Sequence, residues 1–391
     1  MNSDGDTAIF LDHHSTTPCD DDVVERMAKL FRCPLNPHSG HAAGRLAADH
    51  VDASRRSVAR SLGIDESTVV FTSGATESVH LAIAGVMRHP RVKHRRIITT
   101  AIEHPCVLET CAALRDEGCQ VDYVAIDNHG RVNLDAMAEL CRQPFALASI
   151  GYANNEIGVI QNMNALGQMV RDAGGVLHSD ATQAVGRVPI DVVANGIDLL
   201  SASAHKFYGP MGVGLLAIGG AGRRVRVRPM IHGGGQQLGR RVGTVATPLV
   251  VGLAAALEKS IQRLNDQAIR TSQLRDGLWS GLCRRIEGLD TSAINGPPIE
   301  SRDRLPGNLN FTLPRVEGEA WIAASPRVCF SSGSACSSVD PEPSHVLRAI
   351  GRTESQARRS VRFGVGRGND EQQIKTAIEH LADAYRKLAN V

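Results

Sequence analysis

Several features that would place this chain in a specialised class are missing from its sequence. No stretch of about 18 or more residues is both apolar and free of charge, so no segment is suited to span a bilayer as a helix. The 43 Lys and Arg residues are nearly balanced by 41 Asp and Glu residues, and a formal net charge of +2 provides no general attraction for nucleic acid. With 42% hydrophobic residues the composition is globular. An anionic ligand therefore has to be bound by a local site.

The cysteines and the N-terminal segment also exclude some classes. The nine cysteines contain no C-x-x-C pair, which disfavours a structural zinc site and a disulfide-exchange motif. We expect most of them to be reduced, buried and small hydrophobic residues, with one or two reactive at most. Residues 1–7 are acidic and lack the basic and apolar regions of a secretory signal peptide, which predicts a cytoplasmic protein.

Short β-branched runs alternate with helix-like stretches between about residues 60 and 220. This alternation predicts an α/β fold with a mostly parallel sheet that is covered by helices on both faces. The apolar spacing after Ser78 and over residues 165–173 predicts two of these helices. The expected strands lie at residues 68–71, 96–99, 121–124, 146–150, 175–178 and 197–200.

The chain is predicted to contain two domains. Residues from about 250 to 289 read as a long helical stretch that is followed by the Asn-Gly-Pro-Pro turn at 295–298. We place the boundary within this stretch. It separates a large domain at 15–260 from a small α+β domain at 261–391, which residues 1–14 complete.

The remaining elements are predicted from local patterns. In the small domain, strands are expected at 309–313 and 360–363, and a closing helix at 371–388. The Arg-Arg-Val-Arg-Val-Arg run at 223–228 alternates with period 2, so its arginines would share one face of a strand. A solvated edge strand is the favoured interpretation, and a strip that docks a partner or faces a phosphate is the alternative.

A turn of small residues, Ser73 to Ser78, lies between an expected strand and an expected helix. The backbone N–H groups of such a turn point out of the helix N-terminus and can bind an anion such as a phosphate. The same pattern also fits a plain helix cap. The turn lacks both G-x-x-x-x-G-K and G-x-G-x-x-G, which disfavours a P-loop nucleotidase and a dinucleotide enzyme.

Two further candidate residues follow consecutive strands. Asp180 lies near the carboxyl end of the strand expected at 175–178, at the edge where open α/β sheets bind ligands. Lys206 follows the next apolar run and precedes a glycine-rich turn that lets a flat ligand approach the backbone. Taken singly, each also fits a structural role, because Asp180 could cap a helix and Lys206 could be an ordinary solvated lysine. Together with the anion-binding turn they supply a carboxylate for a ring nitrogen and an amine for a Schiff base, which are the needs of pyridoxal phosphate.

These residues belong to a series of motifs that runs in order over nearly the whole chain. The motifs lie at residues 11–18, 36–39, 71–78, 103–104, 154–158, 180–183, 203–206, 232–235, 241–244, 331–336 and 361–363. In this series the sequence resembles the NifS/IscS-type cysteine desulfurases, which are class V aminotransferase relatives of fold type I. The resemblance implies a fold-type I pyridoxal-phosphate-dependent transferase, with a large domain and a smaller α+β domain. It also implies a homodimer that acts on L-cysteine and delivers sulfur to an acceptor protein.

The resemblance assigns roles at the cofactor. Lys206 would form the Schiff base, Asp180 would keep the pyridine nitrogen protonated, and His104 would stack on the ring. Gln183 would hydrogen-bond the phenolic oxygen. The phosphate would be bound by small polar residues and backbone groups, namely Ala75, Thr76, Ser203, His205 and, from the second subunit, Thr244. No metal is expected, because no second ligand stands at a metal spacing from these histidines.

The resemblance also assigns the sulfur chemistry. Asn155 and Arg362 would hold the substrate carboxylate, the arginine in bidentate fashion. Cys336 lies among small residues, which is typical of an exposed loop, and would take the sulfur as a persulfide while L-alanine is released. An incidental surface thiol is the alternative for Cys336. Cys329 is expected to be a buried strand cysteine. The acceptor would belong to iron–sulfur cluster assembly or to a thiolation pathway.

Two other functions stay open from the sequence. A selenocysteine lyase or C–S lyase of the same fold would not need Cys336. A sulfur-carrier scaffold without turnover is the third possibility, but the joint presence of His104, Asp180, Lys206 and Cys336 argues against it.

Overall fold

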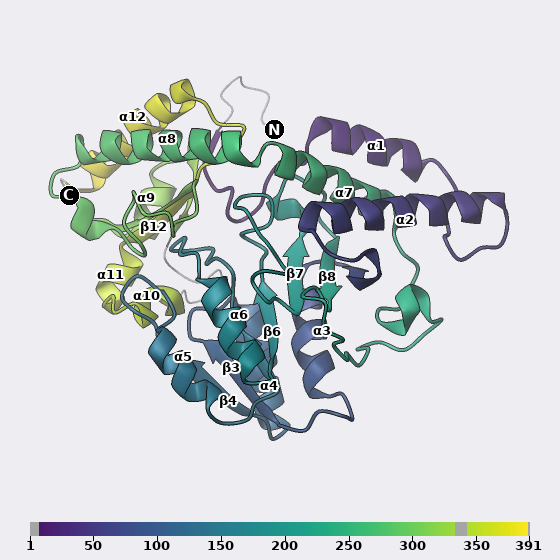
Figure 1. Ribbon diagram of the computed structural model, residues 1–391. Coiled ribbons are helices and arrows are strands. Elements are labelled where there is room, and N and C mark those ends of the chain that lie inside the picture. Colours follow the sequence, from purple (N-terminus) through teal and green to yellow (C-terminus); the bar gives the residue numbers. More distant parts are fainter. Residues whose placement is uncertain (1–7, 333–341, 390–391) are drawn as a thin grey trace.

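A seven-stranded sheet forms the centre of the computed structural model, which describes residues 8–332 and 342–389 (Figure 1). Its strands are, in spatial order, β2 (Val69–Thr72), β8 (Gly214–Ile218), β7 (Leu199–Ser203), β6 (Val176–Asp180), β5 (Leu147–Ser149), β3 (Arg96–Thr100) and β4 (Gln120–Val124). All neighbours are parallel except β8, which runs antiparallel to both β2 and β7. The predicted α/β fold with a mostly parallel sheet is therefore confirmed.

The predicted strands of this region are all present, but β8 is not among them. Its sequence, Gly-Leu-Leu-Ala-Ile, directly follows a glycine-rich turn, and all five residues are buried. A strand that is buried on both faces shows no alternation of apolar and polar residues, so periodicity cannot reveal it.

Helices cover both faces of the sheet, as predicted. On one face lie α3 (Ala75–Met87) and α4 (Pro105–Asp116). On the other lie α2 (Ala42–Leu62), α5 (Leu134–Cys141), α6 (Met163–Asp172) and α7 (Thr247–Gln262), and α1 (Asp21–Phe31) packs on α7. Successive strand residues point to opposite layers: Ile97 packs with α3 and α4, and Ile98 packs in the other layer.

A second apolar core surrounds a three-stranded antiparallel sheet near the C-terminus. Its strands are β11 (Ser331–Ser332), β12 (Ser360–Gly364) and β9 (Asn308–Thr312), and its helices are α8 (Leu264–Cys283), α9 (Gly318–Ala323) and α12 (Glu371–Ala389). Aromatic rings fill this core, where Trp321 packs edge-on against Phe330 at a centroid distance of 5.2 Å. The helical stretch near 250–289 consists of α7 and α8, which meet at Arg263. The domain boundaries at 15–260 and 261–391 stay a prediction.

The chain crosses between the two cores more than once. Strand β1 (Ile9–Phe10) pairs in parallel with β10 (Val328–Cys329), so the N-terminal segment joins the C-terminal part. The short helices α10 (His345–Ala349) and α11 (Glu354–Arg358) bury apolar side chains against Ile157 and Val159, which belong to the large sheet's loops. None of the helices in the described ranges is long and apolar enough to cross a membrane.

The interpretation of residues 223–228 as an edge strand is wrong. The segment alternates in exposure, with Arg224, Arg226 and Arg228 exposed, but it pairs with no strand in the described chain. It crosses α3 instead, and the N–H of Arg228 donates to the carbonyl of Gly85. A Cβ on Gly85 would lie 2.4 Å from Val227, so the close crossing depends on glycine.

The prediction that most cysteines are buried is also wrong. Among those that the structure describes, only Cys111 and Cys119 are buried. Cys329 lies in strand β10, as predicted, but is exposed. The neighbouring Val328 points into the core, and strand side chains alternate, so Cys329 must point outward.

Candidate active site

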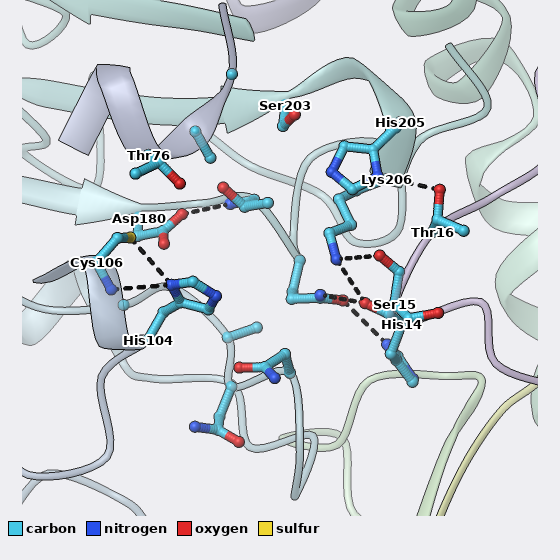
Figure 2. Close-up of a pocket in the computed structure, with 18 of the residues that line it drawn as sticks. His14, Ser15, Thr16, Thr76, His104, Cys106, Asp180, Ser203, His205 and Lys206 are labelled. Carbon is cyan, nitrogen blue, oxygen red and sulfur yellow. Dashed lines mark hydrogen bonds between the residues drawn. The ribbon is translucent and has the colours of Figure 1, made fainter. Parts of the chain in front are cut away.

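A cavity of about 580 Å³ opens where several strands of the large sheet end (Figure 2). It is lined by the predicted residues Ala75, Thr76, His104, Asn155, Asp180, Gln183, Ser203, His205, Lys206 and Arg362. Residues far apart in the sequence thus meet in one place. Thr244 is exposed and does not line this cavity. Cys336 lies outside the described residues.

The turn from Ser73 to Ser78 begins helix α3, and no side chain caps it. Gly74 is the N-cap residue, and the first N–H groups of the helix therefore face the cavity without a capping partner. Thr76 and Ser203 add hydroxyl groups to the same wall, and Figure 2 shows both on one side of the pocket. A Cβ on Gly214 would lie 2.6 Å from the carbonyl carbon of Gly74, so this glycine permits the close packing of the turn. The arrangement suits a phosphate.

Asp180 ends strand β6 and presents its carboxylate to the cavity. Its Oδ1 accepts a hydrogen bond of 3.0 Å from the backbone N–H of Thr182. No Lys or Arg forms an ion pair with Asp180 within the part of the chain that the structure describes. The buried hydroxyl of Thr182 likewise finds no partner there. A carboxylate in this setting can bind a protonated ring nitrogen.

Lys206 lies in the short 3-10 helix η2 (Ala204–Lys206), directly after β7. Its Nζ donates to the backbone carbonyls of His14, at 2.8 Å, and Ser15, at 2.6 Å. Burial and the nearby guanidinium groups of Arg187 and Arg362 lower the pKa of Lys206 to about 7. The amine is therefore partly neutral at neutral pH, as a nucleophile toward a carbonyl group must be.

The neighbouring histidine of the same 3-10 helix is neutral as well. His205 Nδ1 lies 3.0 Å from Thr16 Oγ1. Burial and the charges of Lys206 and Arg187 lower the pKa of His205 to about 4. The imidazole thus adds a neutral hydrogen-bonding group to the cavity that the uncapped helix also lines.

Arg187 supports the lysine, and sequence reasoning missed it. Its guanidinium donates to the backbone carbonyls of His13 and Lys206 and to Nδ1 of His14, which lies 2.7 Å away. Gln183, four residues earlier, donates from Nε2 to the carbonyl of His14 at 2.9 Å. The segment His13–His14 is thereby held against the turn that carries Lys206. The predicted contact of Gln183 with a cofactor oxygen stays a prediction.

Replacing Arg187 with methionine is expected to destabilise the fold by about 2 kcal/mol, because several buried acceptors lose their donor. Urea unfolding followed by circular dichroism measures this change. Arg60→Met, at an exposed position on α2, is the matched control and should change the free energy of unfolding by less than about 0.5 kcal/mol. Equal stability of the two variants would contradict the role of Arg187.

Arg362 and Asn155 form the wall of the cavity nearest to β12. Arg362 Nη2 donates to Asp12 Oδ1 at 2.8 Å and to Ser331 Oγ at 2.9 Å, and Nη1 lies 3.3 Å from the carbonyl of Asn155. Its buried Nε has no partner within the described ranges. A cation with an unused donor at a cavity wall fits a substrate carboxylate.

Two further residues near the start of α4, Glu103 and Cys106, were assigned no role from the sequence. The buried carboxyl of Glu103 accepts hydrogen bonds from the N–H of Gly151 and from Thr100 Oγ1, and burial raises its pKa to about 7. Cys106 lines the cavity, with its Sγ 3.0 Å from Nδ1 of His104. The sequence pattern that could have indicated these two residues is Glu-His-Pro-Cys at 103–106, where α4 begins. Within the described chain, no group of His, Cys, Asp or Glu side chains is arranged to hold a metal ion.

Comparisons with known proteins identify the family of the chain. Residues 9–376 match the family model described as aminotransferase class-V. The chain is 41% identical to the "Cysteine desulfurase IscS" of Ehrlichia chaffeensis over 381 residues, which cover 97% of this chain and 92% of that protein. It is 42% identical to the "Probable cysteine desulfurase, mitochondrial" of Dictyostelium discoideum, with 98% of this chain and 84% of that protein covered. A solved structure described as a NifS-like protein superimposes with a TM-score of 0.89 at 33% identity, covering 98% of this chain and 100% of that one.

Proposed function

The chain belongs to the aminotransferase class-V family, and from this membership we propose that its cavity removes sulfur from L-cysteine with pyridoxal phosphate as cofactor. The identity of about 40% to cysteine desulfurases extends over nearly the whole chain, so the relatives include both cores and the cavity. The observation that carries the proposal is the placement of Lys206 and Asp180 in one cavity at the uncapped N-terminus of α3.

The residues present fit the cofactor. When bound, pyridoxal phosphate supplies a sink for the electrons that are left on the substrate Cα after deprotonation. Lys206 would hold the cofactor through Nζ, and its neutral amine would accept the Cα proton of the substrate. Asp180 would keep a proton on the ring nitrogen, and His104 would cover the ring. The N-terminus of α3 would bind the phosphate together with Thr76, Ser203 and His205.

The substrate end of the cavity and Cys336 complete the reaction. Arg362 and Asn155 orient the carboxylate of L-cysteine. The Cys336 thiolate attacks the substrate sulfur, so that an S–S bond forms and the Cβ–S bond breaks. The electron pair of the broken bond stays on Cβ, which is protonated, and L-alanine leaves. The persulfide on Cys336 then passes its sulfur to an acceptor protein of iron–sulfur cluster assembly or thiolation, in the cytoplasm.

The proposal is tested by Asp180→Asn in the holoenzyme. A neutral amide does not stabilise a protonated ring nitrogen, so alanine formation from L-cysteine should fall on the order of 10²-fold or more. Asp172→Asn, at an exposed position, is the control and should retain the wild-type rate. Near wild-type turnover by Asp180→Asn would overturn the role of this carboxylate, and no alanine from the wild-type holoenzyme would overturn the function.

The protein is further proposed to act as a homodimer in which Thr244 of one subunit reaches the phosphate site of the other. Thr244 is exposed, and it lies outside the cavity of its own chain. Sedimentation should give a dimer, and Thr244→Ala should weaken cofactor binding by about tenfold, as expected for one lost hydrogen bond. A monomer with full cofactor occupancy would contradict this arrangement.

A further inference from the structure

Cys106 is a second thiol in the active-site cavity, and the proposed reaction does not use it. It is the second residue of α4, and His104 is the N-cap residue of the same helix. Its Sγ lies 3.0 Å from His104 Nδ1, and both side chains line the cavity. Figure 2 shows Nδ1 on the side of Cys106 and the other ring nitrogen on the far side of the imidazole.

The backbone of Cys106 decides which atom donates in this contact. Its N–H also points at His104 Nδ1, at 3.2 Å, where it caps the helix. A backbone N–H can only donate, so Nδ1 must be the acceptor and cannot carry a proton. The thiol facing the same nitrogen must then donate as well. In the neutral ring, the single proton lies on Nε2.

The thiol can fill this role because it keeps its proton. Burial, and after it the carboxylates of Asp180 and Glu103, raise the pKa of Cys106 well above the usual range of a thiol. The same conditions disfavour a thiolate at this position, so Cys106 is not suited to attack the substrate sulfur.

We propose that Cys106 is a positioning residue whose thiol donates a hydrogen bond to Nδ1 of His104 and, together with the backbone N–H of Cys106, holds this histidine as the neutral Nε2–H tautomer. The inference deepens the proposed function, on which it rests, because His104 is the residue that covers the cofactor ring. A second proton on the ring would have to bind Nδ1, where it would point at two groups that are themselves donors, the backbone N–H and the thiol of Cys106. Cys106 therefore opposes protonation of His104 and keeps its Nε2–H available to the cavity.

Other groups also act on the titration of His104, and they stay in place when Cys106 is changed. Burial is the main cause that lowers the pKa of His104, and the charges of Lys206 and His345 lower it further. The carboxylates of Asp180 and Glu156 act in the opposite direction. A change measured on replacing Cys106 therefore reports the thiol.

The test compares the holoenzyme with Cys106→Ala, Cys106→Ser and the control Cys111→Ala. Cys111 is a buried cysteine on the same helix, and no hydrogen bond from its thiol is found among the described residues. Nitrogen NMR of labelled histidine should identify the Nε2–H tautomer of His104 in the wild type. In Cys106→Ala its protonation equilibrium should shift about tenfold toward the charged form, since one hydrogen bond to the neutral ring is lost. Cys106→Ser retains a donor and should restore most of the wild-type value.

Two further readouts separate positioning from mere packing. Infrared spectra of the wild type and of Cys106→Ala should differ by the S–H stretching band of Cys106. This band should lie at lower wavenumber than the band that is lost in Cys111→Ala, because the Cys106 thiol donates a hydrogen bond. In His104→Ala the Cys106 band should move to higher wavenumber, because the acceptor is gone. The acid limb of the kcat profile should move to higher pH in Cys106→Ala, because the charged form of His104 then persists to higher pH, but not in Cys111→Ala.

The proposal is overturned if the titration of His104 is unchanged in Cys106→Ala, or if L-cysteine leaves a persulfide on Cys106. The infrared and NMR results need no turnover. They therefore test this inference even if the wild-type protein releases no alanine, an outcome that would overturn only the proposed function.

Discussion

Replacement of Lys206 with alanine is expected to abolish turnover of L-cysteine, with a loss on the order of 10⁴-fold or more, as for other residues on which a covalent mechanism depends. The variant should also lose the visible absorption band of the yellow holoenzyme, and borohydride should no longer fix the cofactor to the protein. The reason is local: Lys206 supplies an amine to the cavity that Asp180 and the N-terminus of α3 also line.

The environment of Lys206 adds a pH dependence to this prediction. The pKa of Lys206 is lowered to about 7 by burial and by the charges of Arg187 and Arg362, and only the deprotonated amine reacts with an aldehyde. The rate at which cofactor-free protein takes up pyridoxal phosphate should therefore rise as pH increases through about 7 and level off above it. Arg187→Met removes one of these charges and should move the rise to higher pH. A colourless wild-type protein after incubation with the cofactor, or a rise only near pH 10.5, would contradict the assignment.

Cys336→Ser is expected to keep the yellow colour and the binding of L-cysteine while forming no persulfide. Binding depends on Lys206, Asp180 and the N-terminus of α3, whereas sulfur abstraction needs a thiolate. A serine hydroxyl has a pKa far above that of a thiol, about 8.5, and is a poor nucleophile toward sulfur. Alanine, sulfide and protein-bound persulfide are measured after addition of L-cysteine.

Cys329→Ser is the matched control, because this exposed thiol lies only seven residues before Cys336. It should form persulfide at the wild-type level. Two results would contradict the prediction. Undiminished alanine formation by Cys336→Ser would indicate a lyase, for which the thiol is dispensable, and a persulfide on Cys329 would make that residue the nucleophile.

The sequence alone was sufficient to predict the central sheet apart from β8, and the place of Asp180 and Lys206 at strand ends. Runs of β-branched residues that alternate with helical spacing predict parallel strands, and parallel strands end at a common edge. Asp180 ends one strand and Lys206 comes shortly after the next, so their convergence in one cavity could be predicted without coordinates. The sheet and the convergence of these two residues follow from local sequence patterns combined with general rules of α/β topology, so a single sequence is enough to predict them.

Only the tertiary structure decided how these residues are held and how they titrate. Lys206 donates to the carbonyl of His14, 192 residues away in the sequence, and no local pattern predicts such a contact. The same is true of the exposure of Cys329, which depends on which side of β10 faces the core. Burial and nearby charges are set by segments that are distant in the chain, and both lower the pKa of Lys206, through its enclosure in the cavity and through the guanidinium groups of Arg187 and Arg362.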